Sequence, residues 1–246
     1  MENNSLAPDG GSPAPVGKKK TRKIIIIAAL LALFFLAAYF FSLIRKNINN
    51  LNGSSNGNTN TPTIETSDDP YAGNPDAKVV IVEFGDFECP YCFQSFPVVR
   101  ELIAEYKDQI KFIYRDFPLA ASHAHAEMAA EAAECAHEQG KFWEMHDKLF
   151  INQQNLENSD LKIYAREIGL NANVFDQCLD SRQYKNEVTQ DFNDGIFAGV
   201  DGTPTFFING HLFEGSPTLD NFKLAIDRLL IIYKGGTQGG NQGGGD

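Results

Sequence analysis

One segment limits the possible folds of this chain more than any other: residues 79–92, where an apolar stretch runs into a Cys-Pro-Tyr-Cys motif. Residues 79–84 are short, β-branched and uninterrupted, which predicts a strand buried on both faces. Pro90 suits the first position of a helix, because an N–H at that position would have no partner inside the helix. Apolar residues then recur at helical spacing, at Phe96, Val99, Ile103 and Tyr106. The two cysteines of the motif therefore lie where a buried strand gives way to a helix.

This position gives the cysteines a specific chemistry. Cysteines three positions apart on a first helical turn can form a disulfide with each other. Cys89 lies among the unpaired N–H groups at the positive end of the helix dipole, and such motifs have thiol pKa values of roughly 3.5–7.5, against ~8.5 for free cysteine. We expect Cys89 to be the nucleophile and Cys92 the thiol that resolves a mixed disulfide. Cys-x-x-Cys alone also describes half of a zinc site, so this interpretation depends on the strand and the helix around it.

A carboxylate is expected beneath the motif. Glu83 alternates onto the strand face that carries Val79 and Ile81, which should be buried. An isolated buried carboxylate is costly, so Glu83 should be protonated or paired. Two interpretations are open: a proton acceptor for Cys92 during thiol–disulfide exchange, or a glutamate at a strand end that reaches solvent.

Together these features resemble the thioredoxin superfamily. The resemblance depends on the strand, the acid six residues before the first cysteine, the Cys-Pro-Tyr-Cys motif and Pro97. The longer string at residues 74–92 is similar to the DsbA-type extracytoplasmic branch. The resemblance implies a thioredoxin-like α/β fold with a helical insertion, and thiol:disulfide oxidoreductase activity without a further cofactor.

Residues 200–205, which include Pro204, precede a predicted hairpin. A proline that opens a strand has an ordinary explanation, because it needs no ladder partner there. The resemblance implies instead a cis proline beside the two cysteines, which shapes the substrate groove, with substrate-binding positions at Thr203, Pro90 and Tyr91. Threonine before the proline resembles the isomerase and reductase branches, and Pro-Tyr departs from the usual oxidase dipeptide. Disulfide formation is our expectation, with reduction or isomerisation as alternatives.

The remaining elements complete the expected fold. A second strand is predicted at residues 110–117, a helical insertion at 122–199, a hairpin around Asn209 and Gly210, and a closing amphipathic helix that ends the domain near 234. A crossover through a helix implies parallel pairing of the first two strands, and the hairpin adds antiparallel ones. We therefore expect one domain at residues 77–234.

The other two cysteines, Cys135 and Cys178, lie in predicted helices of the insertion. Buried free cysteines are common and usually inert. An even cysteine count, an oxidising compartment and similar pairs in DsbA-like relatives imply a structural disulfide between them.

Histidines raise the possibility of a metal site. His123-x-His125 and Cys135-x-His137 are spacings that zinc or copper could use. Scattered surface histidines are the simpler interpretation, so we expect no metal. A metal-binding or metal-delivery module stays as an alternative function.

The N-terminal region predicts a membrane anchor. Residues 24–44 carry no charge, and as a helix they would span about 31 Å, which matches a hydrocarbon core of ~30 Å. A cleavable signal peptide is the alternative, but the run is longer than the usual apolar region of roughly 7–15 residues in such peptides, so we expect an uncleaved signal anchor. Five basic residues before this run and two after it predict that the N-terminus lies in the cytoplasm and the domain outside. We expect a disordered tail at 1–23, a flexible linker at 45–76 and a second disordered tail at 235–246.

Charge limits the partners. Residues after 46 carry a net charge of about −16, which argues against nucleic acid and against a membrane-surface patch. We expect a monomer that acts on exported polypeptides and is recycled by a membrane redox partner.

Asp86, Glu88 and Asp201 are acids expected near Cys89, and like charge raises a thiol pKa. They predict a reduction potential inside, and not at the oxidising end of, the range of roughly −120 to −270 mV.

Overall fold

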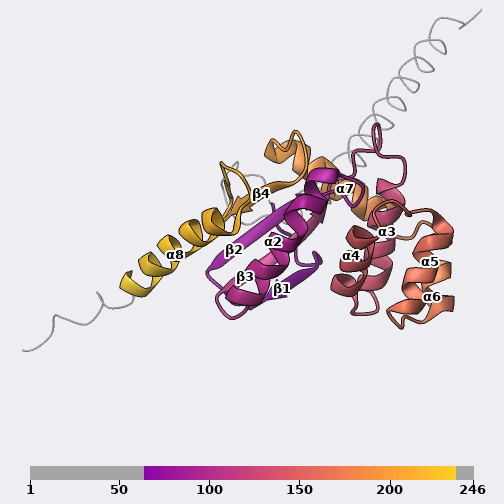
Figure 1. Cartoon of the computed structure of the whole chain (residues 1–246), viewed down its shortest axis with the longest axis horizontal. Coiled ribbons are helices and arrows are strands. Elements are labelled where there is room, and N and C mark those ends of the chain that lie inside the picture. Colours follow the sequence, from indigo (N-terminus) through magenta and orange to yellow (C-terminus); the bar gives the residue numbers. More distant parts are fainter. Residues whose placement is uncertain (1–63, 237–246) are drawn as a thin grey trace, which may run out of the picture. The chain divides into compact units, whose positions relative to one another are not determined.

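The computed structural model describes residues 64–236, in which five strands form one sheet in the order β1-β3-β2-β4-β5 (Figure 1). β2 and β3 are parallel, and the other neighbouring strands are antiparallel. The parallel pair and the hairpin are therefore confirmed. The strands are β1 Tyr71–Gly73, β2 Val79–Gly85, β3 Ile110–Asp116, β4 Thr205–Ile208 and β5 His211–Leu212.

Five helices, α3 to α7, lie between β3 and β4, which confirms the helical insertion. The helices are α2 Pro90–Tyr106, α3 Ala126–His137, α4 Phe142–Ile151, α5 Asn158–Glu167, α6 Ala172–Asp180, α7 Lys185–Ala198 and α8 Leu219–Gly236. Figure 1 shows α3 to α6 grouped beside the end of the sheet where α2 begins. The predicted closing helix is α8.

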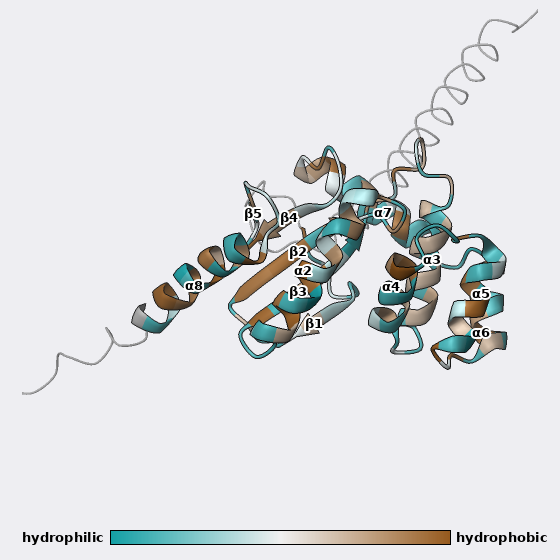
Figure 2. Cartoon of the chain, viewed as in Figure 1, coloured by the Kyte–Doolittle hydropathy of each residue, from teal (hydrophilic) through white to brown (hydrophobic). Residues whose placement is uncertain are grey.

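The sheet has a different cover on each face. On one face, side chains of β2, β3 and β4 pack against α2 and α8, with Leu102 and Phe222 fully buried. On the other face, Phe84 packs with Phe117 and Phe207 in a second core that the end of α7 covers. Figure 2 shows β2 hydrophobic along its length, whereas α8 alternates between hydrophobic and hydrophilic residues. A strand buried on both faces beside an amphipathic helix is what the sequence pattern predicts.

The linker boundary predicted at residue 76 is wrong. Ile64 is only 8% exposed and belongs to the core that contains Val82 and Phe84. Tyr71–Gly73 forms the edge strand β1, which pairs antiparallel with β3. Three residues are too few to show a period of two, so the sequence carries no signal for this strand.

The predicted tail at 1–23, membrane helix at 24–44 and most of the linker and the second tail lie outside the described residues. Within residues 64–236, no helix combines the length and apolar composition needed to cross a membrane.

A buried arginine joins the sheet to the insertion. The side chain of Arg115 on β3 is fully buried, with Nε 3.3 Å from Asp69 Oδ1 and Nη2 2.9 Å from Asp194 Oδ2. It also pairs with Asp191, which accepts a hydrogen bond from the backbone N–H of Asp116 at 3.1 Å. These carboxylates come from the segment before β1 and from α7, so one cation links three parts of the domain.

Candidate active site

The Cys-Pro-Tyr-Cys motif begins helix α2. β2 ends at Gly85, Cys89 is the N-cap residue of α2, and Pro90 takes its first position. The N–H of Phe93 donates to the Cys89 carbonyl at 3.1 Å, which closes the first turn. A Cβ on Gly85 would lie 2.5 Å from the Tyr114 hydroxyl, so only glycine fits where the strand hands over to the motif. The two thiols are buried, with Cys89 3% and Cys92 0% exposed.

The surroundings of Cys89 favour its thiolate form. Its pKa is lowered to about 5, chiefly by a hydrogen bond from the Cys92 thiol. Burial acts in the opposite direction, but hydrogen bonds from Thr203 and from the backbone of Tyr91 and Cys92 add to the lowering. In the dithiol, Cys89 Sγ donates to the Thr203 carbonyl at 3.3 Å. At neutral pH, Cys89 is therefore ionised and is the stronger nucleophile of the pair.

Cys92 is the opposite case. Burial, the hydrogen bond to Cys89 and the nearby Glu83 carboxyl hold the Cys92 pKa well above its usual range. Glu83 itself is 2% exposed, and its burial raises its pKa to about 8. The predicted burial of this acid is confirmed. Glu83 therefore carries a proton at neutral pH and lies close enough to Cys92 for their charges to interact.

Thr203 and Pro204 form the other wall of the site. Their peptide bond is cis, as the resemblance implies. The Thr203 carbonyl contacts Cys89, and the Thr203 hydroxyl is buried beside it. Beside this wall, Tyr91 is 66% exposed, so the motif presents an aromatic ring to any approaching chain.

Two of the three acids expected beside Cys89, Asp86 and Glu88, are paired with histidines, whereas Asp201 is exposed. Asp86 Oδ2 lies 2.7 Å from His123 Nδ1 and accepts the N–H of Leu119 at 2.8 Å. Glu88 Oε2 accepts the N–H of His125 at 2.7 Å, and Glu88 Oε1 lies 3.2 Å from His125 Nδ1. The Cys89 pKa is lowered despite these acids, and hydrogen bonds are the leading cause of the lowering. The reduction potential expected from the acids stays a prediction. Asp-x-Glu facing His-x-His is a signal visible in the sequence, but only the fold brings the two together.

A second residue missed in the sequence is Gln153, in the turn after α4. Its Nε2 donates to the carbonyl oxygens of Phe87 and Cys89, both at 2.9 Å. The insertion therefore holds the backbone on which the nucleophile sits. A glutamine in a loop gives no signal from which this contact could be predicted.

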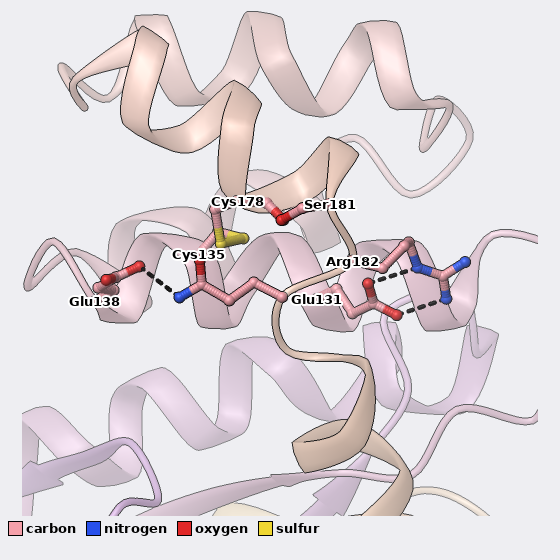
Figure 3. Close-up of a disulfide and its surroundings, with 7 residues drawn as sticks. Glu131, Cys135, Glu138, Cys178, Ser181 and Arg182 are labelled. Atoms are coloured by element: carbon pink, nitrogen blue, oxygen red, sulfur yellow. Dashed lines mark hydrogen bonds and ion pairs between the residues drawn. A yellow bond between two sulfur atoms is a disulfide. The ribbon is translucent and has the colours of Figure 1, made fainter.

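The second cysteine pair forms the disulfide implied by the resemblance. Cys135 on α3 and Cys178 on α6 are bonded, with Cα atoms 5.9 Å apart and a sequence separation of 43 (Figure 3). Beside the disulfide, Arg182 donates to both carboxylate oxygens of Glu131, at 2.6 and 2.5 Å. These links fix α6 and the turn after it onto α3, inside the insertion.

The family profile described as thioredoxin matches residues 65–228. This chain belongs to the thioredoxin family. Its curated relatives include the Na⁺/H⁺ antiporters NhaA 3 of Salinispora tropica, 38% identical over 73% of this chain and 27% of the antiporter, and NhaA 1 of Salinispora arenicola, 40% identical over 66% and 25%. The chain therefore spans about a quarter of the length of these relatives, and antiport is stated of them alone.

Solved structures of this family share the fold. A thioredoxin-like oxidoreductase from Silicibacter pomeroyi aligns with a TM-score of 0.62 at 26% identity, over 71% of this chain and 99% of that one. Oxidised BdbD from Bacillus subtilis aligns with a TM-score of 0.61 at 24% identity, over 70% and 96%. α-DsbA1 from Wolbachia pipientis gives 0.59 at 23% identity, over 71% and 98%. The structural neighbours of this domain are DsbA-like thiol–disulfide oxidoreductases.

No cluster of three or more His, Cys, Asp or Glu side chains in the described part of the chain has the geometry of a metal site. His123 and His125 point a ring nitrogen at a carboxylate instead.

Proposed function

We propose that this domain is an extracytoplasmic thiol–disulfide oxidoreductase that forms disulfides in exported proteins through Cys89 and Cys92. One observation carries the proposal: Cys89 and Cys92 begin helix α2, and the Cys89 sulfur lies 3.3 Å from the Thr203 carbonyl at the cis Thr203–Pro204 bond. In this setting the Cys89 pKa is lowered to about 5, whereas that of Cys92 is raised. A stabilised thiolate favours the reduced form of the site, which makes its disulfide an oxidant. The oxidoreductase from Silicibacter pomeroyi, at 26% identity, supports the same class of reaction.

The reaction starts from the Cys89–Cys92 disulfide. A substrate thiolate attacks the Cys89 sulfur, which forms a mixed disulfide and releases Cys92 as a thiolate. A second substrate thiolate then attacks the substrate sulfur of that mixed disulfide and releases Cys89. The substrate loses two electrons and two protons, and the protein ends as a Cys89 thiolate with a Cys92 thiol. The low Cys89 pKa makes Cys89 the better leaving group in the second step.

Glu83 handles the proton of Cys92 in this scheme. Cys92 leaves as a thiolate in a buried site where its pKa is held well above the usual range, so it must be protonated promptly. Glu83 lies beneath it and carries a proton at neutral pH, because its pKa is about 8. Glu83 can therefore relay a substrate proton to Cys92 during oxidation of the substrate, and relay it away again when the site is reoxidised.

Reduction or isomerisation of exported disulfides is the alternative within the same chemistry, and Thr203 before Pro204 is the observation that favours it. The equilibrium reduction potential separates the two. A value near −120 mV supports the oxidant, and a value near roughly −270 mV supports the reductase. A metal-delivery module would show bound metal in the purified, reduced protein.

We also propose where in the cell this domain lies. A signal anchor at residues 24–44 would hold it outside the cytoplasmic membrane, as a monomer recycled by a membrane redox partner. The charge distribution around that run supports this arrangement. Reporter fusions after Lys46 should be active only outside the membrane, and an N-terminus that starts after residue 38 would show that the anchor is cleaved.

The decisive experiment is substrate trapping. Cys92→Ala should accumulate mixed disulfides through Cys89, because attack is retained while resolution within the site is blocked. The matched control is the Cys89→Ala/Cys92→Ala variant, in which the same bands should be absent on diagonal gels. If neither an oxidising nor a reducing medium produces bands specific to Cys92→Ala, the enzyme proposal fails.

A further inference from the structure

The loop between β3 and α3 places a histidine close to the backbone of Cys89. His123 Nδ1 is 2.7 Å from Asp86 Oδ2. The backbone carbonyl of the same Asp86 accepts the N–H of Cys89 at 3.1 Å, and Asp86 Oδ1 accepts the N–H of Glu88 at 2.7 Å. The His123 ring is therefore linked to the Cys89 backbone through one residue.

The same loop lines a polar pocket of about 350 Å³ beside the motif. His123, His125 and Glu88 form its charged wall, and Pro90 and Gln153 lie at the side of Cys89. The His123 side chain is 18% exposed and that of Asp86 is fully buried, so solvent screens the pair only partly. A charge on this ring therefore acts on Cys89 through a partly desolvated region.

We propose that His123 is the positioning residue that supplies a switchable positive charge to the Cys89 thiolate and takes up the second proton released when a substrate dithiol is oxidised. The inference rests on the proposed function and adds a residue to its mechanism. The Pro-Tyr dipeptide places no titratable cation between the two cysteines, and no Lys or Arg occurs between Lys78 and Arg100. A histidine from another element fills that role here.

The proton balance states the proposal fully. Oxidation of a substrate dithiol releases two protons and two electrons; both electrons reduce the Cys89–Cys92 disulfide. One proton ends on the Cys92 thiol, while Cys89 stays a thiolate. The second proton goes to solvent when His123 keeps the same charge in both redox states. His123 takes it up, in part or in full according to the size of its pKa shift, at a pH between the His123 pKa of the oxidised protein and that of the reduced protein.

The groups that face His123 agree with this. Its burial opposes protonation, but the Asp86 hydrogen bond and charge, the Cys89 charge and the Glu88 charge outweigh it and raise the pKa of His123. The Cys89 contribution exists only in the reduced protein. Besides Asp86, Cys89 and Glu88, the other titratable side chain beside His123 in the pocket is His125, which contacts Glu88.

The first test is the His123 titration itself. In the full chain labelled with ¹³C-histidine, the five imidazole signals can be followed against pH in the reduced and the oxidised protein. We expect the pKa of His123 to be higher in the reduced protein by roughly half a unit or more, and to stay at its oxidised value in Cys89→Ala. An identical His123 pKa in both redox states overturns the proposal.

The second test is the reduction potential against pH. His123→Asn keeps an N–H that can donate to Asp86 but cannot carry a charge. Near pH 6, the equilibrium constant with which this variant oxidises glutathione should be roughly three- to tenfold lower than that of wild type. A tenfold change corresponds to about 30 mV in reduction potential. Near pH 9 the two proteins should have the same equilibrium constant. His211→Asn, an exposed histidine on β5, should equal wild type at both. An equal loss at both pH values would indicate a structural role and would refute the charge mechanism.

The two proposals fail separately. If His123 responds to the redox state but Cys92→Ala traps no substrate, the charge coupling stands and the proposed function falls. If Cys92→Ala traps substrates and the His123 pKa ignores the redox state, the function stands and this inference falls.

Discussion

Replacing Glu83 by glutamine should change how the stability of the domain depends on pH. The Glu83 pKa is about 8 in the folded protein, against an ordinary value of 4.5, because the carboxyl is buried. A carboxyl with a raised folded pKa binds its proton more tightly in the folded state than in the unfolded one. Its contribution to stability is therefore fully present below about pH 4.5 and is lost as pH rises toward 8.

The size of the effect follows from the two pKa values. Each pH unit between them changes the free energy of unfolding by about 1.4 kcal/mol, so the whole interval is worth at most about 5 kcal/mol. About 3 kcal/mol of this is already lost at pH 7. Glu83→Gln removes this titration. The free energy of unfolding of the variant, relative to that of wild type, should therefore rise by about 3 kcal/mol between pH 5 and pH 8, in addition to any constant difference that the amide introduces.

Urea denaturation of the oxidised protein at about pH 5, 6, 7 and 8 measures this difference, and oxidation removes the two active-site thiols from the titration. Other carboxyls with raised pKa values, such as Asp191 and Glu187, are present in both proteins and cancel in the comparison. The matched control is Glu144→Gln, which replaces an exposed glutamate on α4. The difference in free energy of unfolding between this variant and wild type should be the same at every pH. A constant difference between Glu83→Gln and wild type across this range would refute the argument that Glu83 is held protonated by burial.

Two further predictions concern the insertion. Cys135→Ala/Cys178→Ala should lower the free energy of unfolding by about 4 kcal/mol, because the disulfide closes a separation of 43 residues. The usual range for the loss of such a bond is ~2–5 kcal/mol. An unchanged urea midpoint would contradict a structural role for this disulfide. Gln153→Ala should cost roughly 1–2 kcal/mol, since it leaves the carbonyl oxygens of Phe87 and Cys89 without their amide donor. Gln154→Ala, an exposed neighbour in the same turn, should cost nothing measurable, and equal losses in the two variants would contradict the role of Gln153.

The parts of the fold that the sequence predicts are those with a local pattern. The β2 run and the helical spacing after it show their periods within a few residues, and the alternation along β2 places Glu83 on a buried face. The cis bond before Pro204 is predicted from the family resemblance alone. The Cys135–Cys178 disulfide is predicted from the resemblance together with the even cysteine count and the expected oxidising compartment.

What the sequence does not predict depends on contacts between distant segments. Arg115 looks like an interruption in an apolar strand, and two of its carboxylate partners, Asp191 and Asp194, lie 76 and 79 residues further along the chain. His123 and His125 suggested surface residues or a metal site, because their acid partners stand 37 residues earlier. Pairing at such distances is decided by the packing of α3 and α7 on the sheet, which no local period records.

The two halves of the domain contribute differently to the proposed chemistry. The sheet and α2 supply the reacting groups: Cys89, Cys92 and Glu83. The insertion and the loop that leads into it supply the groups that hold them, through Gln153 on the Cys89 carbonyl and His123 on Asp86. The reacting groups therefore belong to the thioredoxin core, and on our proposal the added segment adjusts their dependence on pH through His123. Substitutions in the insertion can accordingly change the reduction potential without touching either sulfur.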